Sequence, residues 1–267
     1  MAPSGNQFYS ARIVNRRNIS EELVVVHVDP GGDFSFTPGQ YATLGVVTPE
    51  KHYERAYSIA SAPHERFMEF FIELVPQGEL TPRLFSRQVG DEITLRKMAK
   101  GRFTVDTVSG HTNHLLIATV TGVAPFVSYA RSLHEQWRHG QFAGDHRFFL
   151  LEGASHAREL GYRVELSRIA ADVPWLTYVP TISRPWEDHF WKGEIGRVDE
   201  LVRKYADDWN LASANTTAYV CGHPSMIDNV KGILHRRGWD PRGIKEEVYF
   251  KPSKQGARAP AAETVAS

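Results

Sequence analysis

The stretch Glu54-Arg55-Ala56-Tyr57-Ser58-Ile59-Ala60-Ser61 is the most informative part of this sequence. Its residue types favour a β-strand, in which successive side chains alternate between two faces. Arg55 and Tyr57 then share one face, and Ser58 points to the other face near the strand's end. A cation beside a flat ring suits a ligand with a phosphate chain and an aromatic ring system, such as a flavin nucleotide. The alternative is a half-exposed strand with Tyr57 in the core and Arg55 in water.

The first part of the chain predicts a small antiparallel barrel. Short runs rich in Val, Ile, Phe and Tyr alternate with turn signals, which is typical of such barrels. One helix is expected over Thr81–Gln88, with Thr81 as its N-cap and Pro82 at its first helical position. The six expected strands are Phe8–Arg16, Leu23–Val28, Tyr41–Val47, Tyr53–Ser61, Phe67–Val75 and Glu92–Arg96.

From His114 onward, apolar runs alternate with amphipathic helical stretches, which predicts a doubly wound parallel sheet covered on both faces. The expected strands are Leu115–Thr121, Phe148–Glu152, Leu176–Ile182 and Ala218–Cys221, and the expected helices are Pro125–Arg138, Tyr162–Ala171, Val198–Trp209 and Met226–Arg237. The fold class is therefore all-β plus α/β. We expect a barrel domain over residues 1–110, an α/β domain over residues 111–250 and a disordered tail over residues 251–267, with the connection at Gly101–Thr112.

Composition excludes several classes of function. Basic and acidic residues number 31 each, so no global charge draws the chain to nucleic acid or membranes. Cys221 is the single cysteine, which rules out a disulfide framework or a cysteine-ligated iron–sulfur cluster in this chain. No metal site is expected, because no second ligand stands at metal spacing from His223. The sequence shows neither a signal-peptide pattern nor a membrane-spanning run, so a cytoplasmic protein is expected.

Four later segments place polar groups where strands or turns lead into helices. Gly78–Leu84 and Ala118–Phe126 combine a glycine with a helix start, where backbone N–H groups can bind phosphate. Ser183-Arg184 follows an expected strand, and Arg197 lies thirteen residues beyond Arg184; two arginines can clamp a phosphate. Cys221–Met226 ends the last of these strands. Each segment alone also has an ordinary reading: a plain helix start, solvated surface charge, a buried strand residue or a loop histidine.

The order of these motifs resembles the ferredoxin–NADP(+) reductase family. The resemblance covers Phe8 to about Phe250, nearly the whole chain. It implies an enzyme that contains FAD and exchanges electrons between NADP(H) and a one-electron carrier such as ferredoxin or flavodoxin. It implies a transient, electrostatic encounter with that carrier, and we expect a monomer. The motifs are Arg-x-Tyr-Ser at 55–58, Gly-x-x-Thr at 78–81, Thr-Gly-Val-Ala-Pro at 121–125, Ser-Arg at 183–184 and Cys-Gly-x-x-x-Met at 221–226.

The resemblance also assigns roles to residues. Ser58 would lie beside flavin N5, Cys221 would border the nicotinamide, and Tyr249 would cover the second flavin face; these three are the expected catalytic residues. The expected FAD-binding residues are Arg55, Ala56, Tyr57, Ser58, Phe71, Ile72, Leu74, Gly78, Leu80, Thr81 and Tyr249. The expected NADP-binding residues are Thr121, Gly122, Pro125, Ser183, Arg184, Arg197, Cys221, Gly222 and Met226.

Two positions depart from the family pattern. Val120 stands where family members usually carry glycine, and for valine both positive φ and close backbone approach are costly. We therefore expect Val120 to narrow the nicotinamide side of the site. Tyr249 is followed by further residues, whereas the equivalent aromatic ends the chain in plant-type members; Tyr249 as a simple strand residue is the alternative. The carrier would be met by basic residues such as Arg16, Arg17, Lys97, Lys100 and Arg102, or these are plain surface charges.

Two rival functions stay open at this stage. One is another enzyme on the same scaffold, either the reductase component of an oxygenase or a free-flavin reductase. The other is a regulatory module that binds a flavin or nucleotide without turnover. A preference for NADPH is expected from Arg184 and Arg197.

Overall fold

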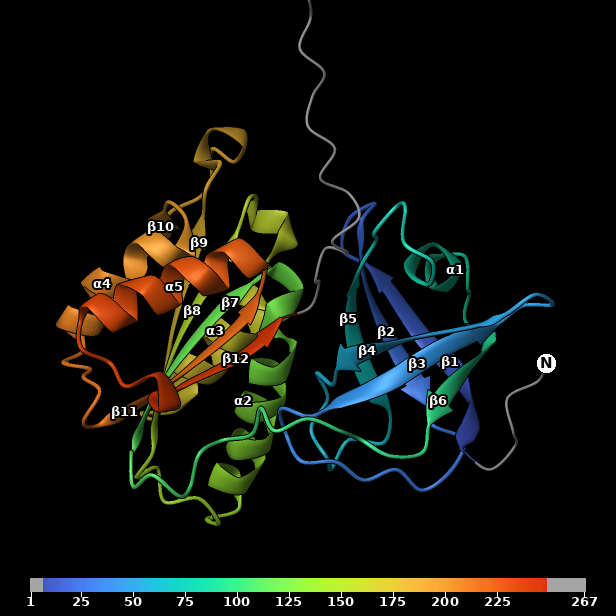
Figure 1. The fold of residues 1–267 in the computed structure, drawn as a ribbon, viewed down its shortest axis with the longest axis horizontal. Coiled ribbons are helices and arrows are strands. Elements are labelled where there is room, and N and C mark those ends of the chain that lie inside the picture. The colour runs from blue at the N-terminus through green and yellow to red at the C-terminus, as the bar shows by residue number, and fades with distance from the viewer. Residues whose placement is uncertain (1–6, 249–267) are drawn as a thin grey trace, which may run out of the picture.

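The computed structural model describes residues 7–248. Figure 1 shows two sheets side by side, with most of the helices gathered around the sheet built from the second half of the chain. Residues 101–112 connect the two sheets without helix or strand. The predicted class, a β-barrel followed by an α/β unit, is confirmed.

The first sheet is antiparallel and has the strand order β4-β3-β6-β1-β2-β5. Its end strands β4 and β5 contact each other, which brings the two edges of the sheet together. All six predicted strands form, and their bounds differ from expectation by at most three residues. They are β1 (Phe8–Asn18), β2 (Leu23–Asp29), β3 (Tyr41–Val47), β4 (His52–Ser58), β5 (Met68–Glu73) and β6 (Glu92–Arg96).

The predicted helix of the barrel is shorter than expected. Helix α1 runs from Thr81 to Phe85, five residues, and its N-cap is Leu80 rather than Thr81. The Thr81 hydroxyl instead accepts a hydrogen bond from the Val75 backbone N–H at 3.0 Å and donates to the Val75 carbonyl at 3.1 Å. The expected N-cap assignment is therefore wrong, because this hydroxyl holds the preceding turn closed.

The second sheet is parallel and has the order β10-β9-β8-β7-β11-β12. Its strands are β7 (Asn113–Thr119), β8 (Arg147–Ala154), β9 (Leu176–Ile182), β10 (Glu194–Ile195), β11 (Thr216–Gly222) and β12 (Ile244–Val248). Helices α2 (Ala124–Arg138) and α3 (Arg163–Asp172) pack on one face, and α4 (Val198–Asp208) and α5 (Pro224–Arg236) on the other. The doubly wound arrangement is confirmed.

Two details of this half differ from the sequence prediction. Residues 120 and 121 were expected at the end of a strand, but β7 stops at Thr119 and a 3₁₀ turn, η1 (Val120–Val123), leads into α2. The two-residue strand β10 was not predicted, because so short a segment carries no periodic signal. The order in which successive strands are added to the sheet reverses between β7 and β11. This is the switch point at which open parallel sheets bind ligands.

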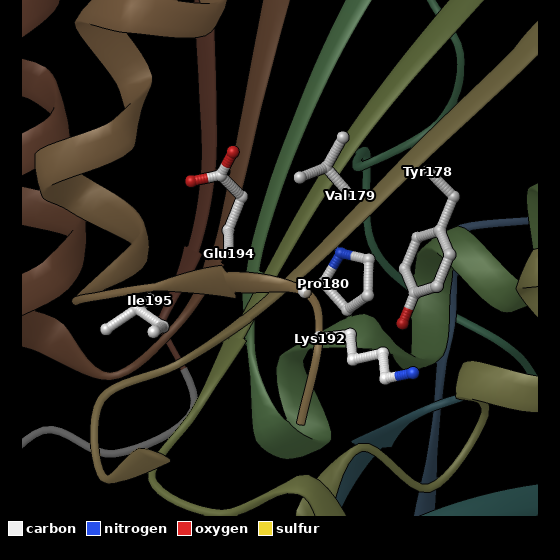
Figure 2. A pocket seen from close by; sticks show the side chains of 7 residues that line it. Tyr178, Val179, Pro180, Lys192, Glu194 and Ile195 are labelled. Atoms are coloured by element: carbon white, nitrogen blue, oxygen red, sulfur yellow. The ribbon is translucent and has the colours of Figure 1, made fainter. Parts of the chain in front are cut away.

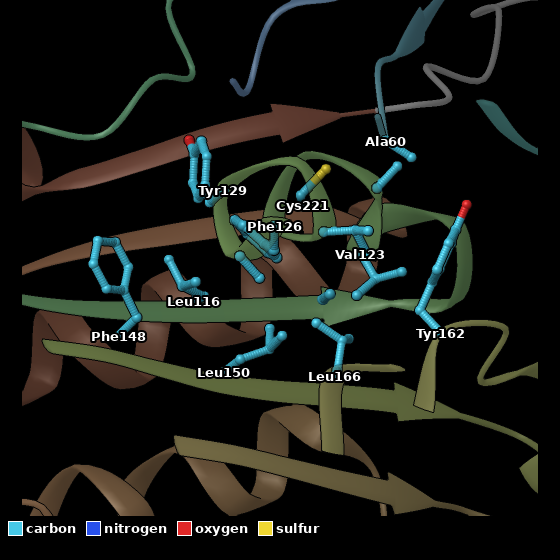
Figure 3. Close-up of a cluster of buried hydrophobic side chains, with 14 of the residues drawn as sticks. Ala60, Leu116, Val123, Phe126, Tyr129, Phe148, Leu150, Tyr162, Leu166 and Cys221 are labelled. Carbon is cyan, nitrogen blue, oxygen red and sulfur yellow. The ribbon is translucent and has the colours of Figure 1, made fainter. Parts of the chain in front are cut away.

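One apolar core joins the two sheets. It combines Ala60 and Phe71 from the barrel side with Phe126 and Tyr129 of α2 and with Cys221 of β11. Figure 3 shows Ala60, Val123, Phe126 and Cys221 converging around η1 and the start of α2. The Tyr129 hydroxyl also donates to the carbonyl of Phe103 in the connecting segment. Because the shared core is apolar and extensive, the two sheets are held in one arrangement.

Candidate functional site

A hollow of about 380 Å³ lies where strand β4, the β5–α1 segment and η1 meet. It is therefore built by both halves of the chain, with one wall residue, Thr121, contributed by the start of the parallel-sheet half. Its lining residues are Arg55, Ala56, Tyr57, Ser58, Phe71, Glu73, Val75, Gly78, Glu79, Leu80, Thr81 and Thr121. The hollow thus collects most of the residues expected to bind FAD.

The strand that opened the sequence analysis forms one wall of this hollow. Arg55 is exposed, and its Nη2 donates to Oε2 of Glu79 at 2.9 Å. Lys51 also pairs with Glu79, at 3.0 Å. Burial raises the pKa of the Tyr57 phenol well above its usual value, so the ring stays neutral. A neutral aromatic ring beside two cations fits a flavin ring and its pyrophosphate.

The glycine turn before α1 forms the opposite wall. The Gly78 N–H donates to the carbonyl of Val75, at 2.8 Å. Because α1 has only five residues, its dipole is small, so the groups at this wall that could hold a phosphate are Arg55, Lys51 and single backbone N–H groups. The Glu79 carboxylate forms ion pairs with both of these cations. A pyrophosphate approaching them would therefore encounter this carboxylate.

Among the described residues, two that were expected at the FAD site, Ile72 and Leu74, do not line the hollow. The side chain of Ile72 is buried in the barrel core, since it alternates with Phe71 and Glu73, which face the hollow. Leu74 is half-buried outside the hollow, and its backbone N–H donates to the Glu22 carbonyl at 2.8 Å. Tyr249 lies outside the described residues. FAD binding by each of the expected residues, inside or outside the hollow, stays a prediction.

Ser58 has a partner that the sequence analysis missed. The Ser58 side chain is buried at the end of β4, and its hydroxyl donates to Oε1 of Glu247 on β12. Burial raises the pKa of Glu247, and the hydrogen bond from Ser58 lowers it in part. The register of β12 against β11 places Glu247 opposite Cys221. The sequence analysis missed the Ser58–Glu247 pair because the pairing of strands that are far apart in the chain cannot be predicted from the residues of each strand alone.

A second, smaller hollow of about 220 Å³ lies at the switch point between β7 and β11. Three residues expected to bind NADP line it: Ser183, Arg197 and Met226. The remaining lining residues were not predicted as ligands, and they come from the ends of β7, β8 and β11 and the starts of α4 and α5. They are Thr119, Val120, Gly153, Ala154, Ser155, Val198, Asp199, His223 and Ser225.

The other residues expected at the NADP site lie around these hollows rather than in the second one. Thr121 lines the larger hollow, Pro125 is buried in the first turn of α2, and Arg184 is exposed beside η3 (Pro185–Glu187). Cys221 is fully buried in the shared core. A nicotinamide could contact its sulfur only if a neighbouring segment shifted, so a catalytic role for Cys221 stays a prediction.

At the switch point, two positions require glycine because neighbouring backbone segments lie too close for a Cβ atom. A Cβ on Gly122 would lie 2.3 Å from the Cys221 carbonyl oxygen. Gly222 has a φ of +133°, and a Cβ there would lie 2.2 Å from Oγ1 of Thr119. Both distances are far below contact, so these positions let η1 and the end of β11 pack together.

Val120 adopts a backbone conformation that β-branched residues rarely take. Its φ is +45°, in the left-handed region that favours glycine. The half-buried side chain packs against Ala154, Leu160 and Ile182 while lining the smaller hollow. The backbone at this turn is therefore strained, and the side chain occupies space beside the expected nicotinamide nucleotide.

Arg197 already has an acidic partner. Its Nε donates to Oδ1 of the buried Asp199 at 3.2 Å, while Nδ2 of Asn229 donates to Oδ2 of Asp199 at 2.8 Å. The Arg197 side chain is half exposed, which leaves its terminal nitrogens accessible to a phosphate.

A further hollow beside the parallel sheet is a shallow groove and not part of this site. Figure 2 shows it between β9 and the segment around β10, with Tyr178, Pro180, Lys192 and Glu194 around it. Its volume is about 550 Å³, yet no predicted site residue lines it. Volume alone therefore does not identify the functional site in this chain.

The described residues show neither a cluster of metal ligands nor a membrane-spanning helix. Within residues 7–248, no cluster of three or more His, Cys, Asp or Glu side chains is arranged to hold a metal ion. In the same part of the chain, no helix has both the length and the apolar character needed to cross a bilayer.

Comparison with known proteins matches both halves of the chain. Residues 10–104 match the oxidoreductase FAD-binding domain, and residues 116–232 match the oxidoreductase NAD-binding domain. The chain is 30% identical over 225 residues to ferredoxin–NADP reductase A of Sorangium cellulosum, covering 83% of this chain and 80% of that protein. It is 28% identical over 244 residues to the toluate 1,2-dioxygenase electron transfer component of Pseudomonas putida, covering 90% and 67%.

A solved structure shares the fold. The ferredoxin NADP+ reductase of Neisseria gonorrhoeae, crystallised with bound FAD and NADP, superimposes with a TM-score of 0.79 at 22% identity, covering 91% of this chain and 99% of that one. The predicted family is confirmed by the sequence relatives, and binding of FAD and of a nicotinamide nucleotide by the two matched domains. The chain belongs to the ferredoxin–NADP reductase family of FAD-dependent oxidoreductases.

Proposed function

We propose that this protein takes hydride from NADPH and passes electrons singly to a carrier protein such as ferredoxin or flavodoxin. The observation that carries this proposal is the composition of the larger hollow. It joins Arg55, Tyr57 and Ser58 of the barrel to Thr121, which opens the nucleotide-binding half. A ligand in this hollow therefore lies against the segment from which a nicotinamide would approach.

The residues around the larger hollow fit FAD. Tyr57 would lie against the flavin ring, Arg55 and Lys51 would bind the pyrophosphate, and Phe71 would exclude water from the inner side. When bound, FAD supplies chemistry that accepts a two-electron hydride and releases electrons one at a time. The protein's contribution is to orient the reacting atoms and to shield them from water.

Ser58 and Glu247 are the groups that we assign to proton handling. The Ser58 hydroxyl lies at the inner end of β4, where it lines the hollow and donates to Glu247. Its oxygen is then an acceptor for a donor in the hollow, and its proton is held toward the carboxyl. Because burial raises the pKa of Glu247, this carboxyl is suited to share a proton with the serine.

The NADP nucleotide is assigned to the smaller hollow. Ser183 and Arg197 would contact the 2′-phosphate there, and Arg184 would approach it from the exposed start of η3. Met226 would lie on the nicotinamide side. This assignment is supported by the position of the hollow at the switch point of the parallel sheet. We place the division between the FAD and NADP domains at residues 110 and 111, which agrees with the two matched segments.

The identity of the carrier, a monomeric state and a cytoplasmic location stay predictions. Among the basic residues considered for carrier binding, Arg16 is engaged elsewhere: its Nη1 donates to the carbonyls of Phe85 and Arg87, at 2.8 and 2.5 Å. The Nζ of Lys97, a half-buried residue, lies over the Tyr9 ring at 5.1 Å from its centre. Arg17, Lys97, Lys100 and Arg102 therefore remain candidates for an acidic carrier.

Steady-state turnover tests this proposal. The protein loaded with FAD is assayed with NADPH or NADH as donor and a purified ferredoxin as acceptor. We expect turnover with NADPH to exceed turnover with NADH. Equal turnover with both would remove the assignment of Ser183, Arg184 and Arg197 to the 2′-phosphate, and no turnover with either would contradict the proposed activity.

A second candidate function is the reductase component of an oxygenase. The similarity to the toluate dioxygenase component supports it. On this reading the acceptor is the iron–sulfur protein of an oxygenase rather than a free ferredoxin. Competition between the two acceptors at equal concentration distinguishes the functions, because the physiological class of acceptor is expected to have the lower KM.

A further inference from the structure

A largely buried network of polar and ionisable side chains connects the barrel to the helices of the parallel-sheet half. Its members are Glu69 of β5, His27 of β2, Arg131 of α2, Tyr162 and Glu165. It lies outside both hollows described above.

Glu69 is the centre of this network. Its side chain is only 5% exposed, and it receives three contacts. Nε2 of His27 lies 2.8 Å from Oε2, the Tyr162 hydroxyl donates to Oε1 at 2.5 Å, and Nη2 of Arg131 lies 3.2 Å from Oε1. Burial alone would raise the pKa of Glu69, but the bond with His27 and the charge of Arg131 outweigh it and lower the pKa to about 2. The negative charge of the buried Glu69 carboxylate is therefore stabilised by side chains from both halves of the chain.

Arg131 connects helix α2 both to helix α3 and to the barrel. It forms a two-point contact with Glu165 of α3, at 2.6 and 2.9 Å, and reaches the barrel side through Glu69, through Glu65 at 3.4 Å and through the Ala60 carbonyl at 3.4 Å. Its side chain is 15% exposed. Because a planar guanidinium fixes the direction of each bond, Arg131 defines the position of α2 relative to β5 more narrowly than apolar packing does.

Both connected elements lead directly into the reaction site. On β5, Phe71 lies two residues after Glu69 on the same face, lines the larger hollow and packs edge-on against the Tyr162 ring at 5.4 Å. On the other side, α2 follows η1, whose Thr121 lines the same hollow. A shift of α2 against β5 would therefore change the distance between a nicotinamide held near η1 and a flavin held against Phe71.

We propose that Arg131 is a positioning residue for hydride transfer, which fixes the parallel-sheet half against the barrel through Glu69 and Tyr162. This inference rests on the proposed function, since it concerns the geometry of the NADPH–FAD step. Misplacement by about 1 Å can cost such a step about a hundredfold in rate. A residue that only stabilised the fold would change the melting temperature and leave the rate of flavin reduction intact.

Rapid mixing of the FAD-loaded protein with saturating NADPH tests the proposal. For Arg131→Leu we expect flavin reduction to slow by about tenfold to a hundredfold, while the dissociation constants for FAD and NADP+ stay within about twofold of the wild type. His134→Ala is the matched control. It lies on the same helix and removes an ion pair with Asp172 that connects α2 to α3 without reaching the barrel. We expect the wild-type rate for this variant.

A second readout does not depend on turnover. Hydrogen–deuterium exchange without NADPH is expected to increase in β5 and in the first turns of α2 for Arg131→Leu, and not for His134→Ala. If Arg131→Leu does not fold, Glu69→Gln replaces it as the test, because glutamine keeps the shape of the Glu69 side chain and removes its charge. We expect this variant to reduce flavin at least threefold more slowly than the wild type. A folded Arg131→Leu variant, or Glu69→Gln in its place, that reduces flavin within twofold of the wild-type rate would overturn the proposal. Failure of the wild type itself to reduce flavin with NADPH would instead contradict the proposed function.

Discussion

The Ser58 hydroxyl donates a hydrogen bond to Glu247, which joins the last residue of β4 to a strand 189 positions further along the chain. The contact crosses from the barrel to the parallel sheet at the inner end of the larger hollow. It places a hydroxyl and a half-buried carboxyl in series beside the expected flavin. The two side chains are therefore expected to act as one unit.

Ser58→Ala is expected to slow flavin reduction by NADPH by about tenfold or more, because a positioned proton donor or acceptor typically contributes at least that much. Glu247→Gln should cause a fall of similar size. If the two residues act together, the double variant is no slower than the slower single variant. Rapid-mixing kinetics measure all three, with the exposed Ser10→Ala on β1 as control. Falls that multiply in the double variant would show that the residues act separately.

Glu79→Gln is expected to tighten FAD binding. Glu79 neutralises Arg55 and Lys51 at the rim of the hollow, where a pyrophosphate needs them. Because exposed ion pairs are weak, the gain is about two- to fivefold in the dissociation constant. Fluorescence quenching of added FAD measures it. Glu50→Gln is the control, since this exposed carboxylate accepts a hydrogen bond from the Thr48 hydroxyl, whereas Arg55 and Lys51 form their ion pairs with Glu79. Unchanged or weaker FAD binding by Glu79→Gln would contradict the role given to Glu79.

Val120→Gly is expected to lower the KM for NADPH. The change removes side-chain bulk from the smaller hollow and suits the positive φ of this residue. Asn210→Gly is the matched control, because Asn210 also has a positive φ, 58°, and lies beyond the end of α4, outside both hollows. Its KM should equal that of the wild type. Identical KM and turnover for NADPH in Val120→Gly and the wild type would show that Val120 does not restrict the nucleotide.

Glu152→Gln is expected to change how stability depends on pH. Glu152 is fully buried on β8, and burial raises its pKa to about 8, with only the Tyr178 hydroxyl acting in the opposite direction. A raised pKa contributes stability that is complete below about 4.5 and is lost as the pH rises through about 8. Relative to the wild type, the variant should therefore gain about 2–3 kcal/mol in free energy of unfolding between pH 6 and pH 9. Urea denaturation at both pH values measures this gain. Parallel stability profiles of the two proteins would mean that Glu152 is ionised in the folded state throughout.

The fold could be predicted because its signals are local. Strands such as Tyr41–Val47, Glu92–Arg96 and Leu176–Ile182 form with the predicted bounds, since turn residues limit each run. On β4, Arg55, Tyr57 and Ser58 all line the larger hollow, and strand alternation is the rule that set their predicted faces. On β5, both Phe71 and Ile72 were predicted to bind FAD. Neighbouring residues face opposite sides of a strand, so Phe71 lines the hollow and Ile72 lies in the barrel core.

The parts of the site that were missed depend on contacts between distant segments. Glu247 and Glu69 read as ordinary strand glutamates, and their roles follow only from the approach of Ser58 and Arg131 in the folded chain. The position of Cys221 in the core, rather than at an open surface, is also set by packing of η1 and α2 over β11. For Val120 the sequence showed an unusual residue, and the positive φ gives the physical reason why it matters.

The most direct test of the central claim is the absorbance spectrum of the FAD-loaded protein during an anaerobic titration with NADPH. The account predicts a yellow protein that retains FAD through gel filtration and whose flavin absorbance bleaches as NADPH is added, at lower concentrations than NADH requires. A protein that does not retain FAD, or that retains FAD without bleaching by NADPH or NADH, would contradict it.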